Sequence, residues 1–582
     1  MQGPTGVKLE AASAASRFEG LQDLEQELKL RTASASLAER CQARERKGLF
    51  EYWTEPRERG TEFFRRHVQD GSPSQSLLNT EFLAAQAGCL LSVGEIKVSP
   101  CQQWMAYTRD FIGHGGAVAC IRNMKGTLRL LAGDKGHSDA PDLQYKAVNV
   151  EWANDGRTLV LTCPDQTGRP CQVSMLDLHH PPTVPTLVFE EHDIKHFVQL
   201  TQSKDESLIM INSHSKTASE VHLLATNQPW TNGLTCVQPR QEGLEYFVEH
   251  HQGWLYILTN LGKPGQELTL CRAPLSQPNR RHWQVVLGAR AGAALEDLDI
   301  FHSCAILHWR ENGHQRLSRI SLDCLQSGKP GHAEGLNDAH GCPDMGWRLV
   351  QPLLHVSEAA QHTTGCTRLH TLTRASLEAT ANGSLRCTTL WAQAQDGTKV
   401  PVTIAYDSEQ VQPPCSSPAL VYAYGAYGRC LDISWVPEHQ VLLEQGFVIA
   451  FAHVRGGGEL GRRWHQAGCG PRKEQSILDL ISCLDHLIEA GFTSPGQIGL
   501  HVTSAGGILL GNVLNRRPDL LGAGIARSPF FDLLDTMTNP EAYLTQHEYS
   551  EWGNPMDSPQ ALDQVRRICP YTNLSQAVEP GP

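Results

Sequence analysis

The sequence lacks three features that would each indicate a particular class of protein. Its 18 cysteines include no Cys-x-x-Cys pair, the spacing typical of many zinc and redox sites. Its first residues lack a charged stretch followed by an apolar core, so we do not expect a secretory signal. No apolar run approaches the roughly 20 residues of a membrane-spanning helix. These absences predict a cytosolic protein with reduced thiols, no metal, no cofactor and no membrane span.

An excess of positive charge is also absent. The 62 Asp and Glu residues outnumber the 50 Lys and Arg residues, and the net charge is −12 at pH 7. Proteins that bind nucleic acid usually carry a basic face, so we expect no nucleic-acid partner. Residues 44–67 interleave basic and aromatic residues, as single-strand binders can. Acidic residues in this stretch nearly cancel its charge, so we interpret it as a surface arm that follows a helix over residues 17–47.

The clearest pattern that is present is a repeat. From about residue 90, a polar turn followed by an apolar-rich strand recurs five times, with the strands beginning at Trp104, Thr158, Ser207, Trp254 and Cys304. The intervals between these starts are 54, 49, 47 and 50 residues. A period near 50 residues built from short strands is typical of a β-propeller, with one blade per repeat. An irregular β-sandwich is the alternative interpretation.

The pattern changes after Ser384, where strand-like and helical segments alternate. We expect strands over residues 419–424, 447–453, 498–502 and 524–528, and helices over residues 438–445, 476–490 and 506–515. Such alternation predicts an α/β domain with a largely parallel sheet.

Ser504 lies where a strand ends and a helix begins, in the segment IGLHVTSAGGILLG. A sharp turn of this kind presents the nucleophile of α/β-hydrolases. The small residues that follow let the helix approach the strand, and the backbone N–H of Ala505 can face a developing oxyanion. The usual pattern is G-x-S-x-G, whereas this chain has Val502 at the first glycine. Taken alone, the motif Ser-Ala-Gly-Gly is also a common turn.

Two other glycine-rich segments belong to the same domain. The stretch LVYAYGAYG ends a strand in a loop that can place the hydroxyl of Tyr424 beside a substrate carbonyl; a buried structural tyrosine is the alternative. The run GGGELG, residues 456–461, matches G-x-G-x-x-G, with Asp479 farther along the chain. It is a weak indication of a dinucleotide site, because the first glycine does not directly follow the strand.

Together these segments resemble the prolyl oligopeptidase family of serine hydrolases (peptidase family S9). The resemblance is carried by SPCQQWMAYTRD and EYFVEHHQGWLYILTN in the repeat region, and by YAYGAYG, HVRGGGELGRRWHQAG, TSAGG and EWGNP in the α/β region. It implies a seven-bladed β-propeller joined to an α/β-hydrolase domain. It also implies a cytosolic serine hydrolase that cleaves short peptides or (thio)esters through an acyl-enzyme. In that reaction Ser504 is the nucleophile, and Tyr424 and the N–H of Ala505 are the oxyanion donors.

The resemblance divides the chain into four parts. These are an N-terminal helical segment over residues 1–75 that packs on the hydrolase domain, a propeller over residues 76–380, a hydrolase domain over residues 381–574, and a tail over residues 575–582 that is unlike the family.

The resemblance also has a gap after the serine. The family's Asp and His follow the serine in sequence, and we expect both to be absent here, with the hydrolase domain incomplete at its C-terminus and a sheet edge left exposed. The only histidine after Ser504 is His547, and a Ser504–His547 dyad is the less favoured alternative. The chain is then either a weak serine peptidase or esterase, or a non-catalytic protein whose propeller binds protein partners in intracellular trafficking or regulation.

Overall fold

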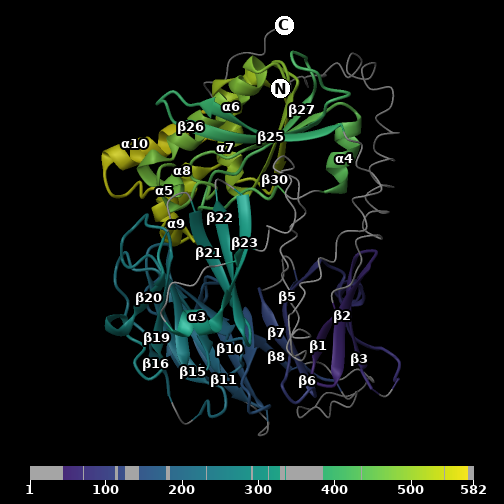
Figure 1. The fold of residues 1–582 in the computed structure, drawn as a ribbon, viewed down its shortest axis with the longest axis vertical. Helices are drawn as coiled ribbons and strands as arrows, with labels where there is room; N and C mark the ends of the chain where they lie inside the picture. The colour runs from purple at the N-terminus through teal and green to yellow at the C-terminus, as the bar shows by residue number, and fades with distance from the viewer. Residues whose placement is uncertain are drawn as a thin grey trace, which may run out of the picture.

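The structure is a computed structural model that describes residues 44–335 and 384–574. Within these ranges it leaves out residues 70, 112–115, 125–142, 179–183, 231–232, 290–292, 312–313, 328–333, 434–435 and 543. The strands up to β24 form one body, and the strands from β25 onward form a second body with most of the helices (Figure 1). No helix among the described residues is long and apolar enough to cross a membrane.

The first body consists of antiparallel sheets of four strands each, and the described residues contain six of them. The first three sheets are formed by β1 (Glu45–Lys47), β2 (Phe50–Arg57), β3 (Gly60–His67) and β4 (Gln75–Asn79); β5 (Leu91–Val98), β6 (Trp104–Phe111), β7 (Val118–Asn123) and β8 (Leu143–Lys146); and β9 (Asn149–Trp152), β10 (Thr158–Pro164), β11 (Pro170–Asp177) and β12 (Thr186–Glu190). The next three are formed by β13 (Phe197–Gln202), β14 (Leu208–His214), β15 (Ser219–Ala225) and β16 (Thr235–Cys236); β17 (Tyr246–His251), β18 (Trp254–Thr259), β19 (Thr269–Pro274) and β20 (Gln284–Leu287); and β21 (Ala293–Ile300), β22 (Cys304–Glu311), β23 (His314–Ser321) and β24 (Glu334–Gly335). Two short helices, α2 (Thr80–Ala87) and α3 (Leu322–Ser327), accompany these sheets.

The sequence repeat follows the second strand of successive sheets. The predicted strand starts coincide with the first residues of β6, β10, β18 and β22, and β14 begins one residue after the predicted start. The second strand is an inner strand of its sheet and is largely buried, as in β10 and β18, so its apolar residues stand out in the sequence. The β-propeller prediction is therefore confirmed. The count of seven blades stays a prediction, because residues 336–383 lie outside the described residues.

The surface arm expected over residues 44–67 is wrong, and so is the helical assignment of residues 45–75. Strands β1–β4 form a first sheet, and β2 begins at Phe50, which is 54 residues before β6. Trp53 stacks on Phe64 with ring centres 5.5 Å apart. The guanidinium of Arg65 is buried and donates to the carbonyl of Met124 at 3.1 Å. The stacked rings thus join two strands within the first sheet, and Arg65 links that sheet to the end of β7 in the second. Residues 1–43, with most of the expected helix, lie outside the described residues.

The second body is built on a six-stranded sheet with the order β25-β26-β28-β27-β29-β30. Its strands are β25 (Leu385–Gln393), β26 (Lys399–Asp407), β27 (Ala419–Tyr422), β28 (Val448–Ala452), β29 (Ile498–Thr503) and β30 (Leu521–Arg527). The last four are parallel to one another. Its helices are α4 (Pro437–Glu444), α5 (Arg462–Gln466), α6 (Glu474–Glu489), α7 (Gly507–Arg516), α8 (Leu533–Thr538), α9 (Thr545–Trp552) and α10 (Pro559–Ile568). The predicted α/β-hydrolase arrangement is confirmed.

An inner strand of this sheet and the strand at one edge differ in burial. Every residue of β28 is buried, because the strand has a partner on each side and helices over the sheet. Strand β30 pairs only with β29 among the described residues, and Ile525 in its middle is 45% exposed. The expected exposed sheet edge therefore lies at β30.

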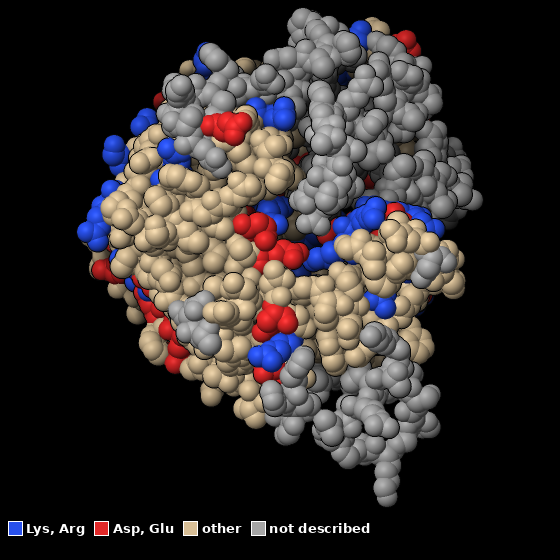
Figure 2. All heavy atoms as spheres, turned by 60° about the horizontal axis from the view of Figure 1, so that its bottom comes forward, with Lys and Arg blue, Asp and Glu red and all other residues tan. Residues whose placement is uncertain are grey.

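Polar contacts join the two bodies. The side chain of Arg462, at the start of α5, pairs with Glu245, and its backbone N–H donates to Glu267 at 2.8 Å. Lys216 of the propeller lies 3.6 Å from Glu548 of α9. The face seen in Figure 2 carries both acidic and basic side chains around a hollow near its centre. On that face the two signs of charge are mixed.

Candidate active site

The order of the strands places the ends of β27 and β29 side by side. Strand β28 lies on one side of β27 and β29 lies on the other side. The chain runs from β27 to β28, whereas from β29 it runs the opposite way across the sheet, to β30. The two strands are parallel, and Tyr422 pairs with His501. Their connections diverge, which opens a crevice beyond their carboxyl ends where α/β proteins commonly bind ligands. Tyr424 and Ser504 follow these two strands and therefore meet at this crevice.

Ser504 forms the turn between β29 and α7, at the start of a short 3₁₀ segment, Ser504–Gly506. Its φ of 52° lies in the left-handed region, which is uncommon for a residue other than glycine. The turn is fixed by the backbone N–H of Phe530, which donates to the carbonyl of Ser504 at 2.8 Å. Ser504 is exposed, whereas Ala505 is buried. The sequence therefore folds locally as a nucleophile turn, with a helix N-terminus directly behind the serine.

Val502, the departure from the usual motif, is accommodated by the glycines on the other side of the serine. Its side chain points into the core and is 1% exposed. A Cβ atom on Gly506 would lie 3.0 Å from the Cβ of Val502, and a Cβ on Gly507 would lie 2.6 Å from the carbonyl oxygen of Phe530. Gly506 and Gly507 have no side chains, and this leaves room for Val502 at the position where the usual motif has its first glycine.

Tyr424 lies in the loop after β27, close to Ser504. Burial raises the pKa of the Tyr424 phenol, while a hydrogen bond with Ser504 acts in the opposite direction. The phenol is therefore protonated at neutral pH and can donate a hydrogen bond. The next residue, Gly425, has a φ of 60°, and a Cβ there would lie 2.6 Å from a methyl group of Val454. Glycine is needed at this position for both its conformation and its size.

The glycine run at residues 456–461 packs against the Tyr424 loop. The N–H of Gly428 donates to the carbonyl of Gly456 at 3.0 Å. Asp479, the candidate ribose ligand, is fully buried and accepts hydrogen bonds from the Arg455 guanidinium at 2.6 and 2.8 Å. The carboxylate is committed to this ion pair, and the glycines allow two loops to approach closely. The geometry does not favour a dinucleotide site.

A buried ion cluster, formed by Lys473, Glu551 and His465, supports the Tyr424 loop. Lys473 Nζ lies 2.8 Å from Glu551 Oε1, and His465 Nε2 lies 2.8 Å from Glu551 Oε2. Burial alone would raise the pKa of Glu551, but Lys473 and His465 together lower it to about 2. Lys473 also donates to the carbonyl of Gly425 at 2.6 Å. The ionised carboxylate thus fixes Lys473, and Lys473 fixes the residue next to Tyr424.

The alternative Ser504–His547 dyad is wrong. The Nδ1 atom of His547 lies 3.0 Å from the carbonyl oxygen of Lys195, and its ring centre lies 4.3 Å from that of Phe197. His547 therefore binds the propeller. Across the described parts of the chain, no histidine ring is hydrogen-bonded to Ser504. Three carboxylates that follow Ser504 have other partners: Asp532 caps α8, Asp557 accepts a hydrogen bond from Asn554, and Asp563 pairs with Arg567.

The ion cluster was not predicted from the sequence, because the three residues that form the cluster are far apart in the chain. Lys473 lies between a Gly-Pro-Arg turn and α6, where a lysine is ordinarily exposed. The only local signal is Glu551 beside Trp552 in the EWGNP segment, since an acidic residue within a buried helical turn requires a partner.

A propeller joined to an α/β-hydrolase sheet with a serine at the nucleophile turn defines a class of two-domain hydrolase folds. Two family descriptions match this chain, that of the prolyl oligopeptidase N-terminal beta-propeller domain over residues 6–340 and that of the prolyl oligopeptidase family over residues 434–580. The chain belongs to the prolyl oligopeptidase family.

Individual relatives agree with this assignment. The chain is 32% identical to prolyl endopeptidase-like from Gallus gallus over 501 residues, which cover 84% of this chain and 65% of that protein. It is 28% identical to dipeptidyl aminopeptidase BI from Pseudoxanthomonas mexicana over 88% of this chain and 70% of that one. The solved structure of oligopeptidase B from Leishmania major superposes with a TM-score of 0.80 at 23% identity, covering 96% of this chain and 79% of that one. The chain thus spans about two thirds of the length of the chicken relative.

Proposed function

We propose that this chain is a serine hydrolase that attacks the carbonyl carbon of short peptides or (thio)esters with Ser504. The Ser504 oxygen bonds to the carbonyl carbon as its O–H bond breaks and its proton passes to solvent, and the carbonyl oxygen becomes an oxyanion. Tyr424 Oη–H and the N–H of Ala505 donate hydrogen bonds to this oxyanion, and the leaving group departs as the acyl-enzyme forms. Water then releases the acyl group from Ser504.

The meeting of Ser504 with Tyr424 carries this proposal. Residues in sparsely populated backbone conformations cluster at functional sites, and Ser504 has such a conformation. Here the phenol of Tyr424, from the loop after β27, lies beside that serine, because β27 and β29 are parallel neighbours that pair at Tyr422 and His501. The helix N-terminus behind Ser504 adds backbone donors and a favourable dipole for negative charge.

The rate of this reaction depends on which group accepts the proton of Ser504. A positioned base contributes about 10²–10⁴-fold to such reactions. We propose that the catalytic Asp and His are not contributed by the 582 residues of this chain, so that it attacks slowly when assayed by itself. A cytosolic location stays a prediction that is compatible with the free thiols of the described cysteines.

A fluorophosphonate probe tests the proposal, because it labels serines that attack an electrophilic centre. We expect labelling of the 582-residue chain that is lost in Ser504→Ala and kept in Ser528→Ala. Ser528 is a matched control, since it is also exposed and also has a positive φ, at the end of the adjacent strand β30. Equal labelling of the wild type and Ser504→Ala would overturn the enzymatic proposal.

That negative outcome would support the second candidate, a non-catalytic protein whose propeller binds protein partners. The observation that favours this candidate is the absence of a histidine bonded to Ser504 in the described residues. The same experiment therefore decides between the two functions for this polypeptide.

A further inference from the structure

Three side chains with metal-binding atoms meet on one face of the fourth propeller sheet. Glu220 and His222 lie two residues apart on β15, so they point to the same face of the strand. Cys236 on β16 is the direct partner of His222 in the antiparallel ladder, and directly paired residues project on the same side. The strand register therefore brings together a carboxylate, an imidazole and a thiol from positions up to 16 residues apart.

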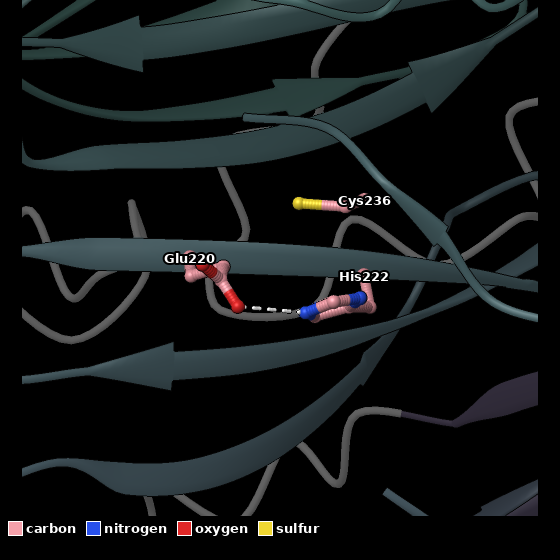
Figure 3. Close-up of side chains that lie close together, drawn as sticks. All are labelled: Glu220, His222 and Cys236. Atoms are coloured by element: carbon pink, nitrogen blue, oxygen red, sulfur yellow. Dashed lines mark hydrogen bonds and ion pairs between the residues drawn. The ribbon is translucent and has the colours of Figure 1, made fainter. Parts of the chain in front are cut away.

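The donor atoms of these side chains already lie close to one another. One oxygen of Glu220, one ring nitrogen of His222 and the sulfur of Cys236 all lie within 4.8 Å of each other. Glu220 Oε1 and His222 Nε2 are 2.9 Å apart, along the dashed line in Figure 3. Around a tetrahedral zinc ion, neighbouring ligand atoms are about 3.3–3.8 Å apart, given bond lengths of about 2.0–2.3 Å. The separations of the three donor atoms are thus close to those of one coordination sphere.

The surroundings hold the ligands in place. Glu220 Oε2 accepts a hydrogen bond from the backbone N–H of Arg240 at 2.7 Å, which leaves Oε1 directed at His222. The ring of Phe189, from the outermost strand of the preceding sheet, packs on His222 with centres 4.9 Å apart. Carboxylate ligands in metal sites are commonly fixed in this way by a further hydrogen bond.

The charges are also compatible with a divalent cation. A Cys236 thiolate and the Glu220 carboxylate supply two negative charges, which balance Zn²⁺. The nearest strong positive charge, the guanidinium of Arg240, is paired with Glu191 and with Asp193. A set of one sulfur, one nitrogen and one oxygen ligand suits zinc better than magnesium or calcium, which prefer oxygen alone.

We propose that Glu220, His222 and Cys236 form a zinc site at the outer edge of the fourth propeller sheet. Three protein ligands leave one position for water or for an external ligand. On binding, the Cys236 thiol releases its proton to solvent and forms the zinc–sulfur bond. Strand β16 consists of only two residues, Thr235 and Cys236, so the ion would fasten this short strand to β15. The site does not depend on the proposed chemistry at Ser504.

Metal titration of the purified full chain tests this proposal. After removal of metal with a chelator, we expect the chain to take up one equivalent of Zn²⁺. Co²⁺ in its place should show a thiolate-to-cobalt charge-transfer band. Both signals should be lost in Cys236→Ser and kept in Cys101→Ser, which replaces an exposed cysteine on another sheet of the same propeller.

Glu220→Gln provides a second test in case the cysteine variant does not fold. Loss of a residue that only orients a ligand weakens metal sites by about 10–100-fold, so loss of a ligand should weaken zinc binding at least as much. Zinc should also raise the melting temperature of the wild type and leave that of Glu220→Gln nearly unchanged at the same concentration. Binding with equal affinity to the wild type, Cys236→Ser and Glu220→Gln would overturn the proposal, as would no stoichiometric uptake by the wild type.

Discussion

Removing Lys473 from the buried ion cluster should destabilise the hydrolase domain strongly. Lys473 and Glu551 are each 1% exposed, so Lys473→Met leaves a buried carboxylate whose remaining partner in the cluster is the His465 ring, through a hydrogen bond. Losing one member of a buried ion pair typically costs about 3–5 kcal/mol.

The pKa of Glu551 provides an independent magnitude. Its value of about 2, compared with 4.5 for an ordinary glutamate, corresponds to about 3 kcal/mol of stability. Because the folded-state pKa is the lower one, this stability is present above pH 4.5 and is lost as the pH falls toward 2. Both approaches therefore predict a loss of about 3 kcal/mol or more at neutral pH for Lys473→Met.

The assay is urea unfolding, monitored by hydrogen exchange in the strands of the hydrolase domain. This local readout is needed because a two-domain chain need not unfold in one step. Arg517→Ala is the matched control, since Arg517 forms an ion pair with Asp485 in which both side chains are more than one-third exposed. Such pairs contribute about 0–1 kcal/mol. The double variant Lys473→Met with Glu551→Gln should cost less than the sum of the two single variants. Strict additivity, or a loss below about 1 kcal/mol for Lys473→Met, would refute the reasoning.

Three further substitutions test other parts of the structure. Gly507→Ala should destabilise the nucleophile turn by about 1–3 kcal/mol in thermal unfolding, because the new Cβ atom would lie 2.6 Å from a backbone oxygen. Gly288→Ala should have little effect, because the space around Gly288 is open. Equal losses of stability in the two variants would contradict the steric argument. Tyr424→Phe should slow Ser504-dependent probe labelling by about 10²–10³-fold if the phenol donates to the oxyanion, and an unchanged rate would remove Tyr424 from that role. The hydrogen bond that His308 donates to the Asp299 carboxylate raises the pKa of His308. The stability contributed by this pair is therefore present below pH 6.5 and is lost as the pH rises through the folded-state pKa. His308→Gln should flatten that part of the stability–pH profile, and an identical profile would show that the pair contributes nothing.

The features that could be predicted from the sequence are those set by local patterns. The 50-residue period is visible because the second strand of each blade is buried and therefore apolar, as at Thr158 and Trp254. The turn at Ser504 is visible because a strand, a tight bend and a glycine-opened helix are contiguous in the chain. The first sheet escaped prediction because β2 and β3 mix charged and aromatic residues without a regular alternation, and the pairing of these residues across the sheet is not visible in either strand alone.

The remaining features depend on contacts between distant residues. The meeting of Tyr424 with Ser504 required the order of β27 and β29 in the sheet, and the space for Val502 required glycines on the opposite side of the turn. Lys473 meets Glu551 across 78 residues, and Cys236 meets His222 only through the register of two strands. Hydrophobic periodicity and turn residues act over a few positions, so they determined the blades and the serine turn by themselves. The pairing of charges and ligands is decided by which surfaces come together, and only the tertiary structure shows that.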